Sequence, residues 1–287
     1  MKIGVFATFM SPYGTPEMIR EFGQQAEAAG IDSIWMGEHV VLFDEMEFPY
    51  PGSADGRIPV PEGGGMLDTV ATFGLLAGVT STVRLGTGIA LVPQRNPVYT
   101  AKEFATLDWL SGGRMDFGIG VGWCKEEVLA CGYGWEDRGA RCDEFLQTMI
   151  NLWTQPVASF EGEHVQLAPC RMDPKPVQKP HLPIIVGGHG KRSLRRAAEF
   201  GSGWYGFALD TATTATILTQ LDEALAKAGR SRDGFEIVVT PQTTTDEDLA
   251  AYAAMGVDRL VVQLGSQKPE RVTARMGELE RLVTAAA

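Results

Sequence analysis

The sequence has few cysteines, and those it has are not arranged for a metal or a disulfide. Cys124, Cys131, Cys142 and Cys170 form no C-x-x-C pair and have no histidine at zinc-finger spacing. Neither a metal site nor a redox disulfide is therefore predicted, and we expect reduced thiols. Cys124 is not expected to be a nucleophile, because its neighbours in the chain offer no base.

Positive charge and long apolar runs are also scarce. The chain has 25 Lys and Arg residues against 36 Asp and Glu, a net charge of −11, and no basic cluster with interleaved aromatics. Such a surface disfavours nucleic acid as a partner. No apolar run approaches the roughly 18 residues that span a bilayer. The apolar start, Met1–Phe6, lacks a full signal-peptide core and cleavage site, so we expect a cytoplasmic protein without a membrane anchor.

Short apolar runs alternate with amphipathic stretches along the whole chain, which is typical of repeated βα units. One helix is predicted over Thr15–Ala29 and another over Ala212–Ala228, each followed by a glycine. Eight βα units close a (β/α)8 barrel, and no linker divides the 287 residues, so we predict a single domain over residues 1–287. The expected strands are Lys2–Thr8, Ser33–Met36, Arg84–Leu91, Met115–Val121, Leu182–Val186, Gly203–Phe207, Phe235–Val239 and Arg259–Gln263.

Two insertions interrupt the alternation. A Pro/Gly-rich segment, Phe48–Gly65, follows the second strand, and Phe160–Pro180 precedes the fifth. The first would lie at the carboxyl ends of the strands, either as a wall or lid over a site or as a plain surface loop. Near the second, Ser159–Leu167 is predicted to form a β-hairpin with Gly162 at its turn.

Chemistry in a barrel sits after the strands, and there the chain places Glu38-His39 and several glycines. His39 is the candidate acid/base, since an imidazole titrates near neutral pH, and Glu38 is expected to orient or charge it. Gly187-Gly188 precedes a predicted helix start near Lys191 and Arg192, an arrangement that suits a phosphate.

Common nucleotide and hydrolase motifs are missing. A G-x-G-x-x-G pattern started at Gly118 meets Trp123 at its third glycine, and starts at Gly86 and Gly120 fail in the same way. There is no P-loop, H-E-x-x-H helix or G-x-S-x-G elbow. A barrel that binds a cofactor in another way is the remaining interpretation.

Several motifs together resemble the bacterial luciferase-like superfamily and occur in its order. They are Trp35 with Glu38 and His39, Leu85–Gly88 with Pro93, Asn96 and Pro97, Leu107–Arg114 leading into Gly118–Trp123, and Pro176 and Gln178 before Pro183–Gly188. Within that superfamily the chain most resembles oxidoreductases that depend on the deazaflavin coenzyme F420, through Gly122-Trp123, Glu127, Gly132, Arg138, Asp143-Glu144 and Leu152-Trp153.

The resemblance implies a (β/α)8 barrel, usually as a homodimer, with a flavin or deazaflavin across the carboxyl ends of the strands. It also implies a cis peptide at Gly88-Ile89 beneath the ring and catalytic roles for His39 and Glu38. Trp35 would pack as a wall, although an interpretation as plain core stands beside it. The cofactor-binding residues so implied are Trp35, Thr87, Gly88, Ile89, Gly120, Gly122, Trp123, Gly187, Gly188, His189, Lys191 and Arg192.

One departure from the deazaflavin sugar-phosphate dehydrogenases is Trp123, which stands where they carry a glutamate. Glu126 and Glu127 are nearby, but we interpret them as exposed acids in the first turn of the next helix. The sequence therefore predicts an F420-dependent oxidoreductase that passes a hydride between the deazaflavin and a small organic substrate. An FMN-dependent monooxygenase served by a separate reductase, and a non-catalytic carrier of flavin or deazaflavin, stay open as alternatives.

Overall fold

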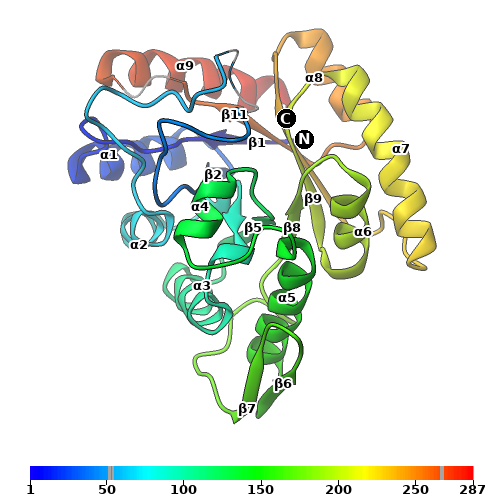
Figure 1. Ribbon diagram of the computed structural model, residues 1–287. Helices are drawn as coiled ribbons and strands as arrows, with labels where there is room; N and C mark the ends of the chain where they lie inside the picture. The colour runs from blue at the N-terminus through cyan, green and yellow to red at the C-terminus, as the bar shows by residue number, and fades with distance from the viewer. Residues whose placement is uncertain (51–52, 54, 266–267, 287) are drawn as a thin grey trace.

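The chain folds as a closed barrel of eight parallel strands, as predicted (Figure 1). The computed structural model describes residues 1–50, 53, 55–265 and 268–286, so part of the predicted first insertion lies outside the described residues. β1 pairs with β11 and β3 pairs with β5, which closes the ring. The barrel strands are β1 (Lys2–Phe6), β2 (Ser33–Met36), β3 (Arg84–Thr87), β5 (Met115–Gly120), β8 (Ile184–Gly187), β9 (Gly203–Leu209), β10 (Glu236–Pro241) and β11 (Arg259–Gln263).

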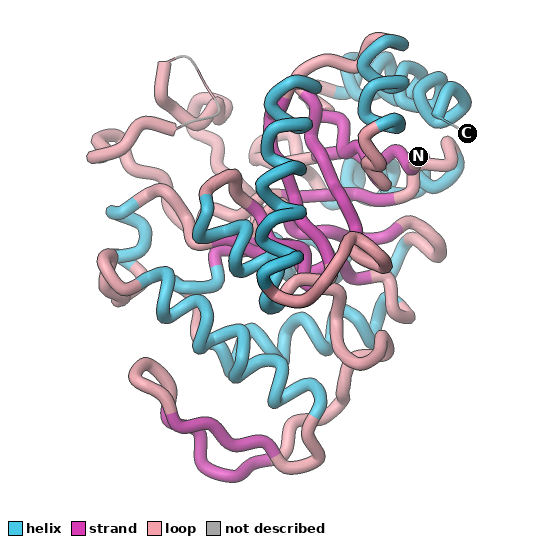
Figure 2. The backbone as a smooth tube through the Cα atoms, turned by 90° about the vertical axis from the view of Figure 1, so that its right-hand side faces the viewer, coloured by secondary structure: helices cyan, strands magenta, loops and turns pink. Residues whose placement is uncertain are grey.

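Helices follow the strands and cover the outside of the barrel (Figure 2). The helices are α1 (Pro16–Ala28), α2 (Thr69–Val79), α3 (Pro97–Ser111), α4 (Lys125–Ala130), α5 (Arg138–Thr154), α6 (Lys191–Phe200), α7 (Thr211–Lys227), α8 (Asp246–Ala254) and α9 (Pro269–Ala286), with a short 3-10 turn, η1 (Val92–Gln94). Within the described residues, none of these helices combines the length and apolar character of a membrane span.

The ends of α1 follow from local sequence chemistry. The Thr15 side chain accepts a hydrogen bond from the Met18 backbone N–H, and Pro16 occupies the first turn, where no N–H is needed. Gly30, just beyond the helix, has a φ of 71°, a left-handed conformation that glycine adopts without strain. Both ends therefore lie within a residue of their predicted positions.

The predicted third strand, Arg84–Leu91, is not one continuous strand. It is divided into β3 and a two-residue strand, β4 (Ala90–Leu91), by the cis peptide between Gly88 and Ile89 that the family resemblance implies. β4 rejoins the barrel wall beside β5, where Ala90 is the partner of Ile119. The break brings the Ile89 side chain to the carboxyl ends of the strands.

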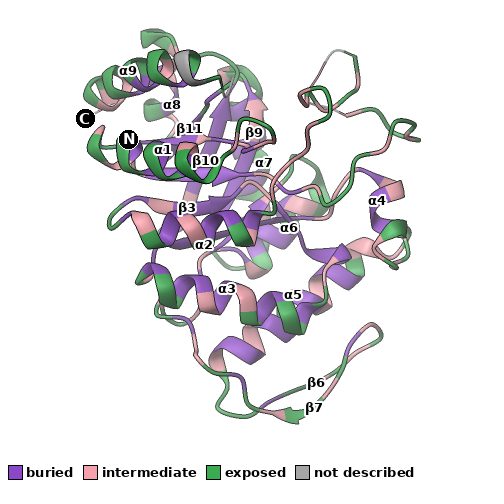
Figure 3. Cartoon of the chain, turned by 90° about the vertical axis from the view of Figure 1, so that its left-hand side faces the viewer, coloured by how far each residue is buried: buried purple, intermediate pink, exposed green. Residues whose placement is uncertain are grey.

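The predicted hairpin is confirmed. β6 (Ala158–Glu161) and β7 (Gln166–Cys170) pair antiparallel, and the Gly162 N–H donates to the Val165 carbonyl across the turn. Figure 3 shows this hairpin projecting beyond α5, away from the barrel strands and largely exposed. It contributes no residue to the site described below.

Aromatic and aliphatic side chains fill the middle of the barrel. Trp35 stacks on Tyr205, with ring centroids 5.3 Å apart, and both are buried with Ile185, Val238 and Val261. Gly86 has room for no side chain, because a β-carbon there would lie 2.5 Å from the Trp35 ring. The barrel is thus a packed core rather than a pore.

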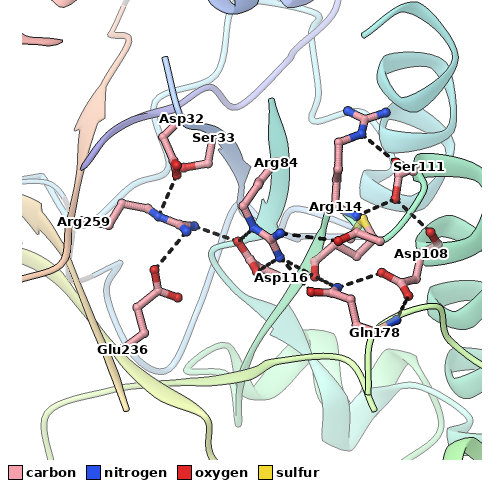
Figure 4. A network of polar contacts seen from close by, with 12 residues as sticks. Asp32, Ser33, Arg84, Asp108, Ser111, Arg114, Asp116, Gln178, Glu236 and Arg259 are labelled. Carbon is pink, nitrogen blue, oxygen red and sulfur yellow. Dashed lines mark hydrogen bonds and ion pairs between the residues drawn. The ribbon is translucent and has the colours of Figure 1, made fainter. Parts of the chain in front are cut away.

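The amino-terminal end of the barrel is closed by a buried ionic network (Figure 4). Asp116 binds Arg84 at one side and the Arg259 guanidinium at 2.7 Å on the other. Arg259 also contacts Asp32 and Glu236, each at 2.9 Å. Since every described member has an opposite charge beside it, the network is a structural plug and leaves the opposite end of the barrel for chemistry.

Candidate functional site

Glu38 and His39 follow β2 but point to different partners. Glu38 is 6% exposed; one carboxylate oxygen accepts the Leu91 backbone N–H at 2.7 Å and the other pairs with Arg95. Burial raises the pKa of Glu38, and the Arg95 charge opposes that rise. The expectation that Glu38 orients His39 is therefore wrong, because both carboxylate oxygens of Glu38 bind elsewhere, to Leu91 of β4 and to Arg95.

The acidic partner of His39 is Glu127, on α4. Its Oε2 lies 2.8 Å from His39 Nδ1, and its Oε1 accepts the Val40 backbone N–H at 2.6 Å. The side chains of His39 and Glu127 are only 12% and 1% exposed. The interpretation of Glu127 as an exposed first-turn acid is thus wrong, since α4 begins so close to the barrel that its first turn faces inward.

Trp123 lies against the open side of this pair. Its ring meets His39 edge-on at 5.7 Å and the Tyr50 ring at 5.5 Å. A hollow of about 340 Å³ opens here, lined by His39, Trp123, Cys124 and residues of the loop after β2, chiefly Val41, Leu42, Phe43, Met46, Ile58, Pro59 and Val60, with Asp44, Asp55 and Arg57. The loop after β2 therefore forms a wall beside His39, with mostly apolar side chains.

The floor of the barrel mouth is apolar and partly exposed. Phe6 and Phe207 pack at 5.3 Å, and Ile89 packs with them on the core below. The Ile89 side chain leaves no room for a side chain at Gly120 or Gly187. A β-carbon on Gly120 would lie 1.8 Å from Ile89 Cδ1, and one on Gly187 would lie 2.8 Å from Ile89 Cγ2. These two glycines seat the isoleucine that forms the floor.

Three of the expected cofactor contacts lie below that floor. Trp35 and Thr87 are fully buried, and both side chains form hydrogen bonds within the barrel. Trp35 Nε1 donates to Ser33 Oγ at 2.9 Å, and Thr87 Oγ1 donates to the Gly118 carbonyl at 2.6 Å. A β-carbon on Gly88 would meet Phe6 at 3.0 Å and Tyr205 at 3.2 Å, so Gly88 faces the core. Trp35 and Thr87 therefore support the residues that line the mouth, which contradicts the expectation that they touch a cofactor. Gly88 is partly exposed, so a contact between its backbone and a cofactor stays a prediction.

The remaining expected residues gather after β8. Gly188 has a φ of 110° and leads into α6, which starts at Lys191 as predicted and has no side-chain cap. His189 Nε2 accepts the Phe207 N–H at 3.3 Å. Within the described ranges, Lys191 and Arg192 form no ion pair. Free amides and unpaired cations favour an anion at this corner.

Arg138, which the sequence analysis used only as a family marker, adds to this corner. Its guanidinium stacks on Trp135, 3.5 Å from the ring centroid, and its buried Nε has no hydrogen-bond partner in the described part of the chain. Burial lowers the pKa of Arg138, the nearby charge of Glu136 opposes that fall, and the charge of Arg192 adds to it. An anionic ligand would favour the charged guanidinium further.

Cys124 lines the hollow beside His39. Cys124 is buried, and burial raises the pKa of its thiol, which disfavours the reactive thiolate. Among the described residues, no group of three or more His, Cys, Asp or Glu side chains could hold a metal ion.

Gly122, the next expected cofactor contact, has a φ of 77° and turns the chain between β5 and Trp123.

The sequence profile of the luciferase-like monooxygenases matches residues 1–282. The chain belongs to this luciferase-like monooxygenase family. An uncharacterised protein of Mycobacterium tuberculosis is 31% identical over 256 residues, which cover 88% of this chain and 89% of that protein. An F420-dependent glucose-6-phosphate dehydrogenase of Kineococcus radiotolerans is 30% identical over 242 residues, 82% of this chain and 66% of that enzyme.

Other members of the luciferase-like family use a different cofactor. An FMNH2-dependent dimethylsulfone monooxygenase of Pseudomonas putida is 31% identical over 183 residues, 61% of this chain and 50% of that enzyme. Among solved structures, a monooxygenase from Streptomyces bottropensis superposes with a TM-score of 0.79 at 21% identity, with both chains fully covered. An F420-dependent secondary alcohol dehydrogenase reaches 0.78 at 17% identity over 100% of this chain and 99% of that one. These two likenesses establish the fold.

Proposed function

We propose that the protein is an oxidoreductase that binds coenzyme F420 across the barrel mouth and interconverts an alcohol and a carbonyl in a small organic substrate. The observation that carries this proposal is the His39–Glu127 pair beside the mouth. Transfer of a hydride to a carbonyl carbon leaves an oxygen that needs a proton, and the reverse reaction must remove one. A histidine held by a buried carboxylate supplies that group.

The residues present fit a deazaflavin. Its planar ring matches the apolar floor of Phe6, Ile89 and Phe207, and its phosphate matches the corner of Lys191, Arg192 and the buried, unpartnered Nε of Arg138. When bound, the deazaflavin supplies the hydride chemistry at its central ring. The chain's own residues bind the ring and phosphate, exclude water through the loop after β2, and hold the proton at His39.

The proposal is tested by titrating the purified protein with coenzyme F420 and with FMN, followed by the fluorescence or absorbance of each ring. We expect tighter binding of F420, and reduction of bound F420 by small alcohols without a requirement for oxygen. Tighter binding of FMN, together with substrate oxidation that consumes oxygen, would instead favour a monooxygenase like the dimethylsulfone enzyme. Binding without turnover of any alcohol or carbonyl would favour a carrier.

His39→Ala separates the proton step from binding. Because His39 lies beside the mouth while the floor and the anion corner do not depend on it, F420 affinity should stay within a few-fold. Turnover should fall by about 10²–10⁴-fold, the usual effect of losing a positioned acid/base. Parent-like turnover in this variant would contradict the proposed role.

We also propose that two copies associate through the outer faces of α2 and α3, which pack side by side (Figure 3). Tyr99, Trp109 and Leu110 on α3 are 73%, 58% and 63% exposed. α2 contains no charged residue at all. A surface helix of this composition is usually covered, and a second copy offers a matching apolar face through two-fold symmetry.

A further inference from the structure

We infer that Glu127 sets the tautomer of His39, so that Nε2 carries no proton when the imidazole is neutral. This inference rests on the proposed function, in which His39 accepts and returns the substrate proton. Glu127 touches no substrate in this view. It is a positioning residue that acts through the histidine.

The two carboxylate oxygens of Glu127 have separate tasks. Oε1 accepts the Val40 backbone N–H at 2.6 Å, and Oε2 lies 2.8 Å from His39 Nδ1. A carboxylate can only accept hydrogen bonds, so Nδ1 must carry the hydrogen that it donates. In a neutral ring the lone pair is then at Nε2, which has no hydrogen-bond partner in the described part of the chain.

The surroundings keep this arrangement in place. Glu127 is buried, so its carboxylate cannot exchange these bonds for water. The Val40 N–H belongs to the backbone directly after His39, and Glu127 Oε1 accepts its hydrogen bond at 2.6 Å. One carboxylate therefore anchors the loop after β2 and orients the ring, although Glu127 and His39 are 88 positions apart in the chain.

The proton step follows from this tautomer. When a substrate hydroxyl loses its proton, the O–H bond breaks and an Nε2–H bond forms, which gives an imidazolium stabilised by the Glu127 carboxylate. In the reverse direction, Nε2 returns that proton to the oxygen. A ring with its neutral hydrogen on Nε2 could not accept the proton there.

Replacing Glu127 by glutamine should invert the tautomer at almost unchanged volume. The amide oxygen must serve the Val40 N–H, because the amide NH2 cannot accept a hydrogen bond. The NH2 group is then left facing His39 Nδ1, which becomes an acceptor, and the ring hydrogen moves to Nε2. Glu127→Asp keeps the carboxylate, whereas Glu126→Gln makes the same chemical change one residue away, where Glu126 accepts from the Glu47 N–H and the Cys124 thiol.

The tautomer is measured directly by 15N NMR of the histidine rings in the full-length protein at a pH where the rings are neutral. The chain has only four histidines, and the signal missing from His39→Gln identifies the one of interest. We expect the Nδ1–H form in the parent and in Glu126→Gln, and the Nε2–H form in Glu127→Gln. An Nε2–H form in the parent would overturn the inference, and this measurement needs no variant of Glu127 to fold.

Kinetics provide the second readout. Glu127→Gln should lower kcat by about 10²–10⁴-fold and leave KM within a few-fold, with partial recovery in Glu127→Asp. A folded Glu127→Gln that keeps the Nδ1–H form and parent-like kcat would contradict the inference. If the tautomers are as expected but neither the parent nor any variant oxidises an alcohol with F420, Glu127 still positions His39 and the proposed function fails.

Discussion

The side chain of Ile89 fills the space beside Gly120. A β-carbon added to Gly120 would lie 1.8 Å from the Cδ1 atom of Ile89. Ile89 thereby forms part of the floor of the barrel mouth, and Gly120 on β5 is the residue that makes room for it. The contact joins β5 to the break between β3 and β4, at the carboxyl ends of the strands that line the candidate site.

Gly120→Ala should therefore destabilise the protein by about 1–3 kcal/mol, the usual result of overpacking. Ile89→Val removes Cδ1, so the double variant should recover part of this loss. Urea denaturation of the two single variants and the double variant measures the coupling. Gly277→Ala, on α9 with nothing within 4 Å of the new β-carbon, is the control and should not destabilise. Additive effects at positions 89 and 120 would contradict the packing argument.

Asp116→Asn should be among the most destabilising single changes at the amino-terminal end of the barrel. Burial alone raises the pKa of Asp116, but the bonds and charges of Arg84 and Arg259 outweigh burial and hold that pKa below its usual value. Removing the charge leaves the buried Arg259 guanidinium and the partly buried Arg84 guanidinium under-compensated, at a cost of about 3–5 kcal/mol in the free energy of unfolding. Asp222→Asn, in the half-exposed pair with Arg232, should cost less than about 1 kcal/mol in the same denaturation assay.

Glu27 should make stability depend on acid pH. Its Oε1 accepts hydrogen bonds from the Ser81 N–H at 2.8 Å, the Thr82 hydroxyl at 2.7 Å and the Val83 N–H at 3.2 Å, which fixes the turn before β3. Burial is the largest single effect and raises the pKa of Glu27, but the hydrogen bonds together outweigh it and lower the pKa to about 2. A pKa lower in the folded than in the unfolded state stabilises the fold above the unfolded value of 4.5, and this contribution is lost as the pH falls towards 2.

Glu27→Gln provides the comparison. The parent should be more stable than this variant at pH 6, and the difference in their urea midpoints should shrink between pH 4.5 and pH 3. A difference that stays constant over that range would show that Glu27 contributes by packing alone.

The anion corner should respond to charge removal and to salt. The double variant Lys191→Ala, Arg192→Ala should weaken F420 binding by about tenfold, as expected for the loss of charge-assisted contacts to a phosphate. Affinity of the parent should fall as salt rises, and less steeply in the variant. Arg20→Ala, which removes an exposed charge on α1, is the matched control and should leave fluorescence titrations unchanged.

Self-association through α2 and α3 is tested at Trp109. Trp109→Glu places a charge in the middle of the proposed apolar interface and should shift the protein from dimer to monomer in analytical ultracentrifugation. Leu129→Glu makes a similar change at a residue on α4 that is 52% exposed, and it should leave the mass unchanged. A monomeric parent at micromolar concentration would remove the proposal.

Local sequence determined the strands, their order and much of the helix chemistry. Apolar runs such as Ser33–Met36 are buried because a parallel strand has helices on one side and the barrel core on the other, and this pattern is visible without coordinates. Thr15, Pro16 and Gly30 act within one helical turn, so their effects were predictable from neighbouring residues alone.

The partners of the charged residues were decided only by the tertiary structure. Glu38 adjoins His39 in sequence, yet successive residues after a strand point in different directions, and Glu38 meets Arg95 instead. Glu127 reaches His39 because the short α4 packs with its first turn against the loop after β2. Which carboxylate holds the histidine depends on the angle at which that helix leaves β5, and this angle follows from packing between segments that are distant in the chain.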